Sequence, residues 1–519
     1  MVLQNDPNGR TACAAPEGVG GSAAVDLRRL PEMKRGEGSS LGMRVTSGAF
    51  WIALEMVAVQ FLSLIVFSIL AHLLTPHDFG LMAISFSFIY SLKFLAIDQI
   101  AVPVIRKPNP SALDWTTAFW LSIAFGVFAA VLLCVFSFTV DTLLHTQGAG
   151  TVMRPMSLIL VCFCLSRTQE AWLTRHFQQR VLAIRSIVGF LLGAAAGIMA
   201  ARMGFGVWSL VIQQVISSFT SLGLLWSTTP WRPGFQFCRE SSGEILSYVK
   251  RISGNTLLNV LSQNMDATLI TFFFGPSSVG IYSVGKRLML ALQAIAANPI
   301  NGVALPALAE TQADPVRERR VFLMATQMVF ACCAPVFFGA AAIAVPIIEF
   351  LFGARWIGAA NVVSWLSVGT LCMMAFGYFG NVLILRNHPA SLTVLTATQT
   401  VLSVCLFVFF HAIGWHVIAA PFVLPYVVTV PLCGRLALQF LKISWSQWLK
   451  AVSPPLVAAA IMSIGIRLLS SSLLAMPAIE KVAVLGMAGA AIYGLCMLCL
   501  ARETLAIGLK LLRLRRTGT

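Results

Sequence analysis

The fold is decided by a long apolar run and the turn that closes it. Residues 49–74 read AFWIALEMVAVQFLSLIVFSILAHLL, and the turn Leu74-Thr75-Pro76-His77-Asp78-Phe79-Gly80-Leu81 follows at the end of the run. A helix that crosses a bilayer needs about 20 mostly apolar residues, and Pro and Gly mark the breaks between such helices. Runs of this kind, separated by Pro, Gly and charge clusters, continue to the end of the chain. They predict an all-α, polytopic membrane protein.

The composition of the whole chain agrees with this prediction. Of the 519 residues, 58% are hydrophobic and 11% are charged, and the mean hydropathy is +0.83. A soluble domain carries about 25% charged residues, so a soluble multidomain protein is excluded. The net charge of +16 would suggest nucleic-acid binding in a soluble protein. In a membrane protein it reflects Lys and Arg in cytoplasmic loops, and we expect no nucleic-acid partner.

The breaks predict about 14 transmembrane helices. With the N-terminus in the cytoplasm, 27 of the 36 Lys and Arg residues fall on the cytoplasmic side and 4 on the other. This asymmetry supports an even number of spans with both termini in the cytoplasm. The predicted spans are 49–74, 79–105, 114–140, 152–171, 181–201, 205–226, 252–274, 279–309, 321–350, 358–385, 391–411, 416–441, 449–469 and 479–500.

The turn after the first span recurs after the seventh. Pro76 and Gly80 reappear 200 residues later as Pro276 and Gly280, again between an odd span and the next even one. We interpret these four residues as turn or hinge positions of an internal repeat; chance is the alternative, because P-x-x-x-G turns are common. Two halves in one orientation are typical of a transporter with a substrate path between them.

The repeat and the charge clusters predict five segments. Two six-helix lobes in a pseudo-two-fold arrangement are followed by two C-terminal helices, with a basic tail at each end. The first tail is predicted to be disordered and cytoplasmic, and the second is cytoplasmic as well. The segments are the tail 1–45, the N-lobe 46–245 (spans 1–6), the C-lobe 246–445 (spans 7–12), spans 13 and 14 in 446–503, and the tail 504–519.

Several charged residues lie inside the predicted spans, where they are costly and usually face a cavity or each other. For three of these residues the alternative is a position near the membrane interface, where the side chain extends to the headgroup region: Asp98, Arg435 and Arg467. The candidates are Glu55, Lys93, Asp98, Asp266, Lys286, Arg287, Arg435 and Arg467.

Spans 7 and 8 carry polar stripes at helical spacing. On span 7 the polar residues are spaced 4, 3 and 4, so they share one face, which lines a hydrated cavity or packs against another helix. Span 8 repeats the spacing, and Asp266 and Lys286 lie at similar distances from the connecting loop, so a pair at mid-depth is possible. The stripes are Asn255, Asn259, Ser262 and Asp266 on span 7 and Tyr282, Lys286, Met289 and Gln293 on span 8.

These residues suggest the chemistry of the substrate. Lysine and arginine bind phosphate through charge-assisted hydrogen bonds, so the cations favour an anionic ligand. The predicted substrate contacts are Lys286, Arg287, Lys93, Asn259 and Gln293, and the predicted ion-coupling residues are Asp266 and Glu55. The twelve Cys lie mostly in apolar runs, the seven His show no metal spacing, and there is no P-loop. We therefore expect no cofactor and no metal.

Four landmarks resemble the polysaccharide-biosynthesis branch of the multidrug/oligosaccharidyl-lipid/polysaccharide exporter superfamily. The resemblance runs from about residue 45 to 500, and His72 stands where the family usually has Arg. The landmarks are Leu70-Ala71-His72-Leu73-Leu74-Thr75-Pro76-His77-Asp78-Phe79-Gly80-Leu81, Asp266-Ala267-Thr268-Leu269-Ile270 with Gly275 and Val279-Gly280-Ile281-Tyr282, Leu305-Pro306-Ala307-Leu308-Ala309, and Leu351-Phe352-Gly353-Ala354-Arg355-Trp356.

The resemblance implies a Wzx-like flippase. Such a protein moves oligosaccharide repeat units on undecaprenyl diphosphate across the inner membrane by ion-coupled alternating access, for exopolysaccharide, capsule or lipopolysaccharide. The implied partners are this lipid, membrane lipids and polymerase or export machinery, and we expect a monomer. Two alternatives remain open. A cation-coupled drug efflux antiporter of the same superfamily should have a net acidic cavity, and a membrane polymerase or ligase should have a large outer loop.

Overall fold

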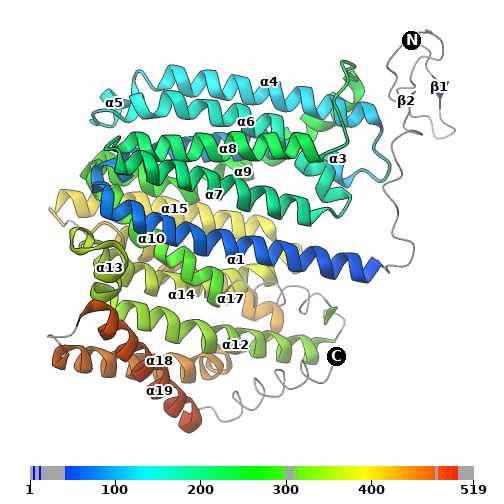
Figure 1. The fold of residues 1–519 in the computed structure, drawn as a ribbon. Helices are drawn as coiled ribbons and strands as arrows, with labels where there is room; N and C mark the ends of the chain where they lie inside the picture. Colours follow the sequence, from blue (N-terminus) through cyan, green and yellow to red (C-terminus); the bar gives the residue numbers. More distant parts are fainter. Residues whose placement is uncertain are drawn as a thin grey trace.

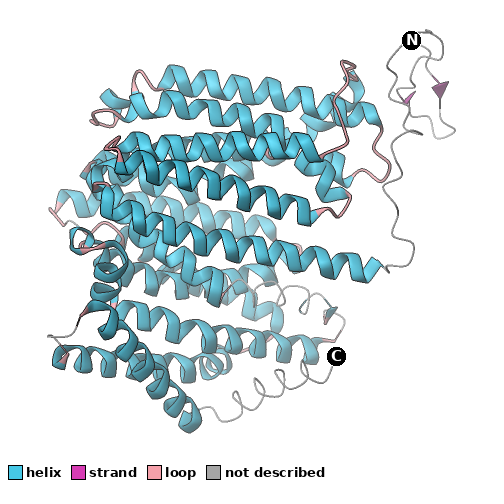
Figure 2. Ribbon diagram, viewed as in Figure 1, coloured by secondary structure: helices cyan, strands magenta, loops and turns pink. Residues whose placement is uncertain are grey.

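The computed structural model of the chain describes residues 4–5, 11–12, 41–297, 308, 310–311, 314–415, 417–473 and 477–500. In these ranges almost everything is helical, apart from short turns and one small antiparallel strand pair near the N-terminus (Figure 2). The elements are β1 (Gln4–Asn5), β2 (Thr11–Ala12), α1 (Leu41–Leu73), α2 (Pro76–Leu92), the π-helical turn η1 (Lys93–Ile97), α3 (Val102–Arg106), α4 (Ala112–Phe136), α5 (Val140–Leu143), α6 (Ala149–Arg175), α7 (Gln179–Arg202), α8 (Val207–Thr228), α9 (Arg239–Phe274), α10 (Pro276–Ala296), α12 (Pro315–Ala342), α13 (Ala344–Phe352), the 3-10 turn η2 (Ala354–Trp356), α14 (Ala359–Leu385), α15 (Pro389–Ala412), α16 (Ala420–Val423), α17 (Pro425–Leu441), α18 (Trp445–Ser472) and α19 (Ala478–Leu500).

Twelve of the described helical segments are long and apolar enough to cross a membrane, so the chain is an all-α polytopic membrane protein. The predicted spans that are not among the twelve correspond to α9 and α10. Both helices are long, with 36 and 21 residues, but they carry the polar stripes and charges noted above. The count of fourteen therefore stays a prediction.

Three predicted spans are interrupted in the structure, and one of them, 416–441, breaks at Leu424 between α16 and α17. Span 79–105 ends its α-helix at Leu92, passes through the π turn η1, and resumes as α3, in which Pro103 occupies the first turn. Span 321–350 breaks at Ile343 between α12 and α13, and Pro346 follows in the first turn of α13. Proline has no backbone N–H, so neither residue can continue the preceding ladder of hydrogen bonds. Span 279–309 is described over α10 and its C-cap Ala297, and again at Leu308.

The turn at Pro76 ends α1 and starts α2 through local chemistry. The hydroxyl of Thr75 accepts from the backbone N–H of Asp78, whose carboxylate accepts from the Thr75 N–H at 2.9 Å. This capping box satisfies the free N–H groups of the first turn, and proline is favoured at the first helical position. The turn identified in the sequence is therefore the boundary between α1 and α2, and its own residues cap the start of α2.

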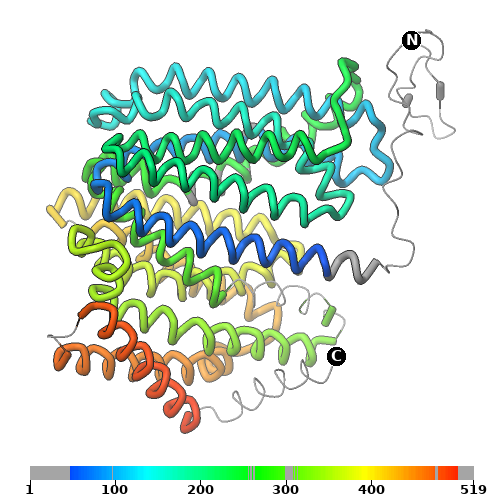
Figure 3. The backbone as a smooth tube through the Cα atoms, in the orientation of Figure 1, coloured from blue at the N-terminus to red at the C-terminus, as the bar shows by residue number. Residues whose placement is uncertain are grey.

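The long helices run back and forth along one direction (Figures 1 and 3). Along the chain they form two consecutive sets: α1, α2, α4, α6, α7 and α8, and α9, α10, α12, α14, α15 and α17. Helix α2 packs on α9 and α10 and so joins the sets, and α18 and α19 pack on each other and on α12. The predicted domain boundary between residues 245 and 246 falls inside α9, and the predicted tail 504–519 lies outside the described residues, as does nearly all of the tail 1–45.

One end of the molecule holds the turns at Pro76 and Pro276, and we call it the Pro76 end. Here the segment after α13 lies on the last turns of α1. The Trp356 indole donates to the Ala71 carbonyl at 3.0 Å, and the Arg355 guanidinium donates to the Leu74 carbonyl at 3.1 Å. Trp356 is fully buried. The two helix sets are therefore joined at this end by specific polar contacts around a large aromatic side chain.

Candidate functional site

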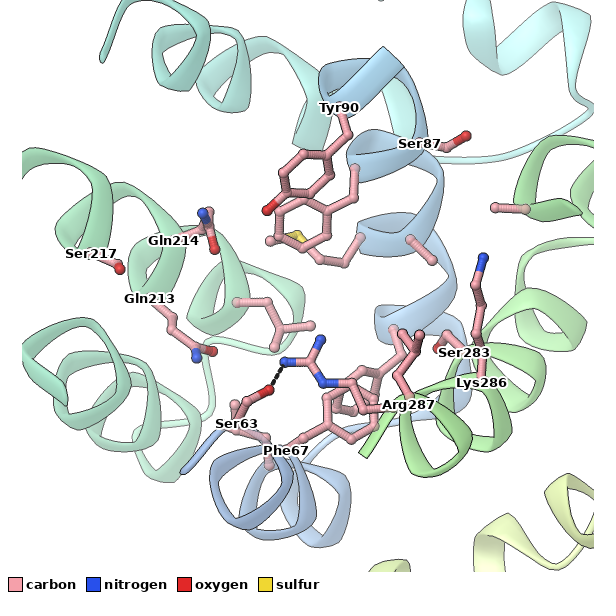
Figure 4. A pocket seen from close by; sticks show the side chains of 18 of the residues that line it. Ser63, Phe67, Ser87, Tyr90, Gln213, Gln214, Ser217, Ser283, Lys286 and Arg287 are labelled. Atoms are coloured by element: carbon pink, nitrogen blue, oxygen red, sulfur yellow. Dashed lines mark hydrogen bonds between the residues drawn. The ribbon is translucent and has the colours of Figure 1, made fainter. Parts of the chain in front are cut away.

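A cavity of about 580 Å³ lies between the two helix sets. Its walls come from α1, α2, α7 and α8 on one side and from α9 and α10 on the other (Figure 4). The charged residues that line it are Asp266, Lys286 and Arg287, and its other polar residues are neutral: Gln60, Ser63, Ser87, Tyr90, Ser186, Gln213, Gln214, Ser217, Ser221, Asn264, Tyr282 and Ser283.

Arg287 reaches from α10 across the cavity to α1. Its guanidinium donates to the Ser63 hydroxyl and lies 5.0 Å from the centroid of the Phe67 ring (Figure 4). Its Nε is buried and has no hydrogen-bond partner among the described residues. No described carboxylate pairs with it. The side chain therefore presents a positive charge and an unused donor next to the cavity.

Lys286 is neutralised within the protein. Its ammonium donates to Oδ2 of Asp266, and the Tyr282 hydroxyl donates to the same oxygen at 2.9 Å. The other oxygen of Asp266 accepts from the backbone N–H of Ala267 at 2.8 Å. The side chain of Asp266 is 10% exposed and that of Lys286 is 37% exposed. The pair that the sequence spacing allowed is present, and it leaves Arg287 as the uncompensated charge among the residues that line the cavity.

The α9–α10 turn explains why this pair forms. Helix α9 ends at Gly275, which has a φ of +79°, and α10 starts directly with Pro276. A positive φ suits glycine because it has no Cβ. The two helices return antiparallel from this turn, so Asp266 and Lys286 meet at one depth. On the same stripe, the side chains of Asn255, Asn259 and Ser262 lie outside the described residues.

Other predicted contact residues lie away from the cavity lining. Lys93 pairs with Asp98 at 2.9 Å across the π turn, whose hydrogen bond runs from the Asp98 N–H to the Lys93 carbonyl. A π turn spans five residues, which brings these two side chains together. Gln293 donates to the Thr370 hydroxyl on α14 at 3.1 Å. Glu55 is half-buried on α1 and does not line the cavity, although it precedes the lining residues of α1 by one turn.

The four turn residues meet at one point. A Cβ built on Gly80 would lie 2.5 Å from the carbonyl carbon of Pro276, and a Cβ built on Gly280 would lie 2.7 Å from that of Pro76. Each glycine of one repeat therefore packs against the proline of the other. This reciprocal contact is the crossing of α2 and α10, which we call the Gly80–Gly280 crossing. The two turns that repeat in the sequence therefore also pack against each other in the structure, at the Pro76 end.

The sequence interpretation missed the wall formed by α8. Gln213, Gln214, Ser217 and Ser221 line the cavity from this helix. Residues 213, 217 and 221 are spaced four apart, which is the same helical pattern that identified α9. This spacing was visible in the sequence, but it was overlooked because none of these residues is charged. Among the described residues, no group of three or more His, Cys, Asp or Glu side chains could hold a metal ion.

Outside the predicted spans, a basic side chain links the two helix sets at the end opposite Pro76. Lys107 lies 3.0 Å from Asp114 and 3.3 Å from Glu244 at the start of α9. Partial burial lowers the pKa of Lys107, but the hydrogen bonds and charges of the two carboxylates outweigh it and raise the pKa above its ordinary value. Lys107 is therefore a fixed cation at neutral pH.

A family model described as polysaccharide biosynthesis protein matches residues 69–361. Succinoglycan biosynthesis transport protein ExoT of Rhizobium meliloti (strain 1021) is 25% identical over 329 residues, which cover 63% of this chain and 66% of the relative, just under two thirds. Teichuronic acid biosynthesis protein TuaB of Bacillus subtilis (strain 168) is 22% identical over 462 residues, or 88% of this chain and 95% of the relative. Lipopolysaccharide biosynthesis protein WzxC of Escherichia coli (strain K12) is 22% identical over 350 residues, or 67% and 71%.

Two solved structures share the fold. Lipid II flippase MurJ in an inward closed conformation superimposes with a TM-score of 0.71 at 13% identity, over 88% of this chain and 99% of that protein. An inward-facing multidrug resistance MATE family transporter of the MOP superfamily gives a TM-score of 0.58 at 15% identity, over 76% and 99%. The resemblance predicted from the sequence landmarks is confirmed by the family match, and these two proteins establish the fold.

Proposed function

The chain belongs to the family of polysaccharide biosynthesis proteins, and on that premise we propose that it moves lipid-linked oligosaccharides across a membrane. The substrate is an oligosaccharide repeat unit on undecaprenyl diphosphate, and it passes from the cytoplasmic to the outer leaflet. The chain is a transporter and not an enzyme. Relatives named for succinoglycan, lipopolysaccharide and teichuronic acid biosynthesis support this assignment.

The observation that carries the proposal is the uncompensated Arg287. Its guanidinium touches a neutral hydroxyl and an aromatic ring, and its buried Nε has no partner among the described residues. A buried donor without a partner costs about 1–3 kcal/mol, and more when it is charged. A diphosphate supplies acceptor oxygens and negative charge to the same group. We therefore assign Arg287 to the diphosphate, with Lys286 as a second cation nearby.

The drug-efflux alternative is less well supported by this cavity. An antiporter for cationic drugs needs a carboxylate that is free to bind them. Asp266 is the acid among the lining residues, and it already accepts from Lys286, Tyr282 and the backbone N–H of Ala267. A cationic ligand would also face Arg287 without a counter-charge. The charge balance of the cavity therefore favours an anionic substrate.

We propose alternating access as the mechanism. In the described conformation the helix sets are joined at the Pro76 end by the Gly80–Gly280 crossing and by the Trp356 contacts. Release of substrate at that end requires both contacts to separate. Protonation or cation binding at Asp266 would release Lys286 for the substrate, which is how ion coupling could act at this site. Glu55, one turn from the lining residues of α1, is the second proposed coupling group.

The proposal extends to location and partners. The multi-pass chain lies in the inner membrane with both termini in the cytoplasm, which is the orientation that the charge asymmetry favours. We expect it to act as a monomer in which both helix sets of the chain line the cavity. Membrane lipids surround it, and a polymerase or export complex takes up its product.

The test is transport by the purified protein in lipid vesicles. Undecaprenyl diphosphate that carries a fluorescently labelled oligosaccharide is placed in one leaflet, and its appearance in the other is followed by a membrane-impermeant quencher. Arg287→Met removes one charged hydrogen-bonding group, and we expect at least about a tenfold loss of rate. Arg287→Lys keeps the charge but loses the planar fork, so we expect partial activity.

Arg435→Met is the matched control. Arg435 lies within α17, is exposed, and does not line the cavity. The control should transport at the unmodified rate. Equal rates for Arg287→Met and the unmodified protein would refute the assignment of Arg287, and absence of transport by the unmodified protein under every ion gradient would refute the function.

A further inference from the structure

Helix α8 presents a neutral polar surface to the cavity. Gln213, Gln214, Ser217 and Ser221 line it from this helix, and we call these four residues the α8 amide face. In Figure 4, Gln213 and Gln214 project from α8 into the cavity, and Tyr90 and Arg287 lie on its other sides. All four side chains are half-buried. The α8 amide face therefore shares one cavity with the cationic residues of α10.

The chemistry of this face differs from that of the Arg287 side. A glutamine amide has two N–H donors and one acceptor oxygen, and a serine hydroxyl both donates and accepts. No described residue forms a hydrogen bond with any of these four side chains. A diphosphate offers only acceptors and cannot satisfy the amide oxygens. A ligand with closely spaced hydroxyl groups offers donors and acceptors together.

Helix α7 fixes the direction in which this face points. Gly193 and Gly197 lie directly against α8: a Cβ on Gly197 would be 2.6 Å from Cβ of Gln213, and a Cβ on Gly193 would be 2.7 Å from Cβ of Ser217. Small residues at this spacing let membrane helices approach closely. The rotation of α8 about its axis is therefore set by backbone packing. A site on such a rigid element can discriminate between ligands of similar shape.

We propose that the α8 amide face binds the sugar next to the diphosphate and thereby selects the oligosaccharide. This inference rests on the proposed function, because it assigns the second half of the same substrate. The diphosphate lies against Arg287, and hydroxyl groups of the adjoining sugar exchange hydrogen bonds with Gln213 and Gln214. Ser217 and Ser221 extend the face by two further turns. Chains that handle other sugars should then differ at these positions.

The experiment compares two ligands on the full-length protein in lipid nanodiscs. One ligand is undecaprenyl diphosphate without sugar, and the other is undecaprenyl diphosphate that carries a neutral oligosaccharide. The double variant Gln213→Met/Gln214→Met keeps the side-chain length and removes the hydrogen bonds. We expect it to bind the sugar-bearing lipid about tenfold more weakly and the sugar-free lipid as before. Arg287→Met should weaken the binding of both lipids.

Gln439→Met is the matched control, because Gln439 is exposed on α17 and does not line the cavity. If the double variant fails to fold, Ser217→Ala/Ser221→Ala tests the same face with smaller changes. Equal losses for both lipids, or no loss for either, overturn the proposal, as does equal binding of the two lipids by the unmodified protein. If the unmodified protein binds neither lipid, the proposed function itself fails.

Discussion

The Gly80–Gly280 crossing makes a quantitative prediction about two substitutions. A Cβ at Gly80 or Gly280 would lie 2.5 Å or 2.7 Å from a proline carbonyl carbon of the opposite repeat. Carbon atoms in favourable contact are about 3.5–4.0 Å apart, so each alanine needs about 1 Å of additional separation. The obstacle is backbone, which cannot move aside by a rotamer change. We expect Gly80→Ala and Gly280→Ala each to cost about 2 kcal/mol of stability or more.

The reciprocal geometry adds a second, sharper expectation. Both clashes occur at the same helix crossing, so one separation of α2 from α10 relieves them together. The double variant Gly80→Ala/Gly280→Ala should therefore cost clearly less than the sum of the single variants, with a coupling of about 1 kcal/mol or more. The assay is reversible unfolding in SDS, followed by the fluorescence of the twelve tryptophans.

Gly223→Ala is the control for this cycle. Gly223 lies in α8, and nothing stands within 4 Å of a Cβ built there. Alanine in a helix interior is favoured over glycine by about 0.5–1 kcal/mol, so this variant should be as stable as the unmodified protein or slightly more so. The reasoning is refuted if the crossing variants behave like Gly223→Ala, or if their costs simply add.

Three further predictions concern the polar residues. Asp266→Asn and Lys286→Met should each destabilise the protein by about 2 kcal/mol, and the double variant by less than their sum, because each single change leaves the other charge without its counter-charge. SDS unfolding of the four proteins measures this, and simple additivity would contradict the pairing. Trp356→Phe removes the hydrogen bond to α1 and part of a buried side chain, and we expect a loss of about 1–3 kcal/mol in the same assay. Lys93→Met should lower stability by about 1 kcal/mol through the loss of its Asp98 pair but leave binding of undecaprenyl diphosphate unchanged. Weaker binding would indicate that Lys93 contacts the substrate.

The fold could be predicted from the sequence because its signals are local. Long apolar runs identify membrane helices without any knowledge of their neighbours, and the turn at Pro76 carries its own capping residues. The break at Ile343 was missed because apolar residues continue through it, and the break at η1 because Lys93 and Asp98 were interpreted as charges inside one continuous span. Only the missing N–H groups of Pro103 and Pro346 indicate that the helices restart there.

The site was only partly predictable, because pairing is not visible in a sequence. Asp266 and Lys286 could be matched, since one turn connects their helices and fixes their depth. Lys93 could not be matched with Asp98, because an α-helix would turn these side chains apart and the π turn was not expected. Arg287 depends on Ser63 and Phe67, which lie more than 200 residues earlier in the chain. No spacing rule connects them.

What distinguishes the cavity is therefore the pattern of compensation among its charges. Two cations and one acid line it, and the acid is already bound by Lys286. Arg287 remains, and the opposite wall is a row of neutral amides and hydroxyls on α8. A purely cationic pocket would bind any phosphate-bearing lipid. It could not distinguish one lipid from another by the sugar that the lipid carries. One unmatched charge next to a neutral hydrogen-bonding wall fits a ligand with the same division, in which an anionic group is joined directly to a polyol.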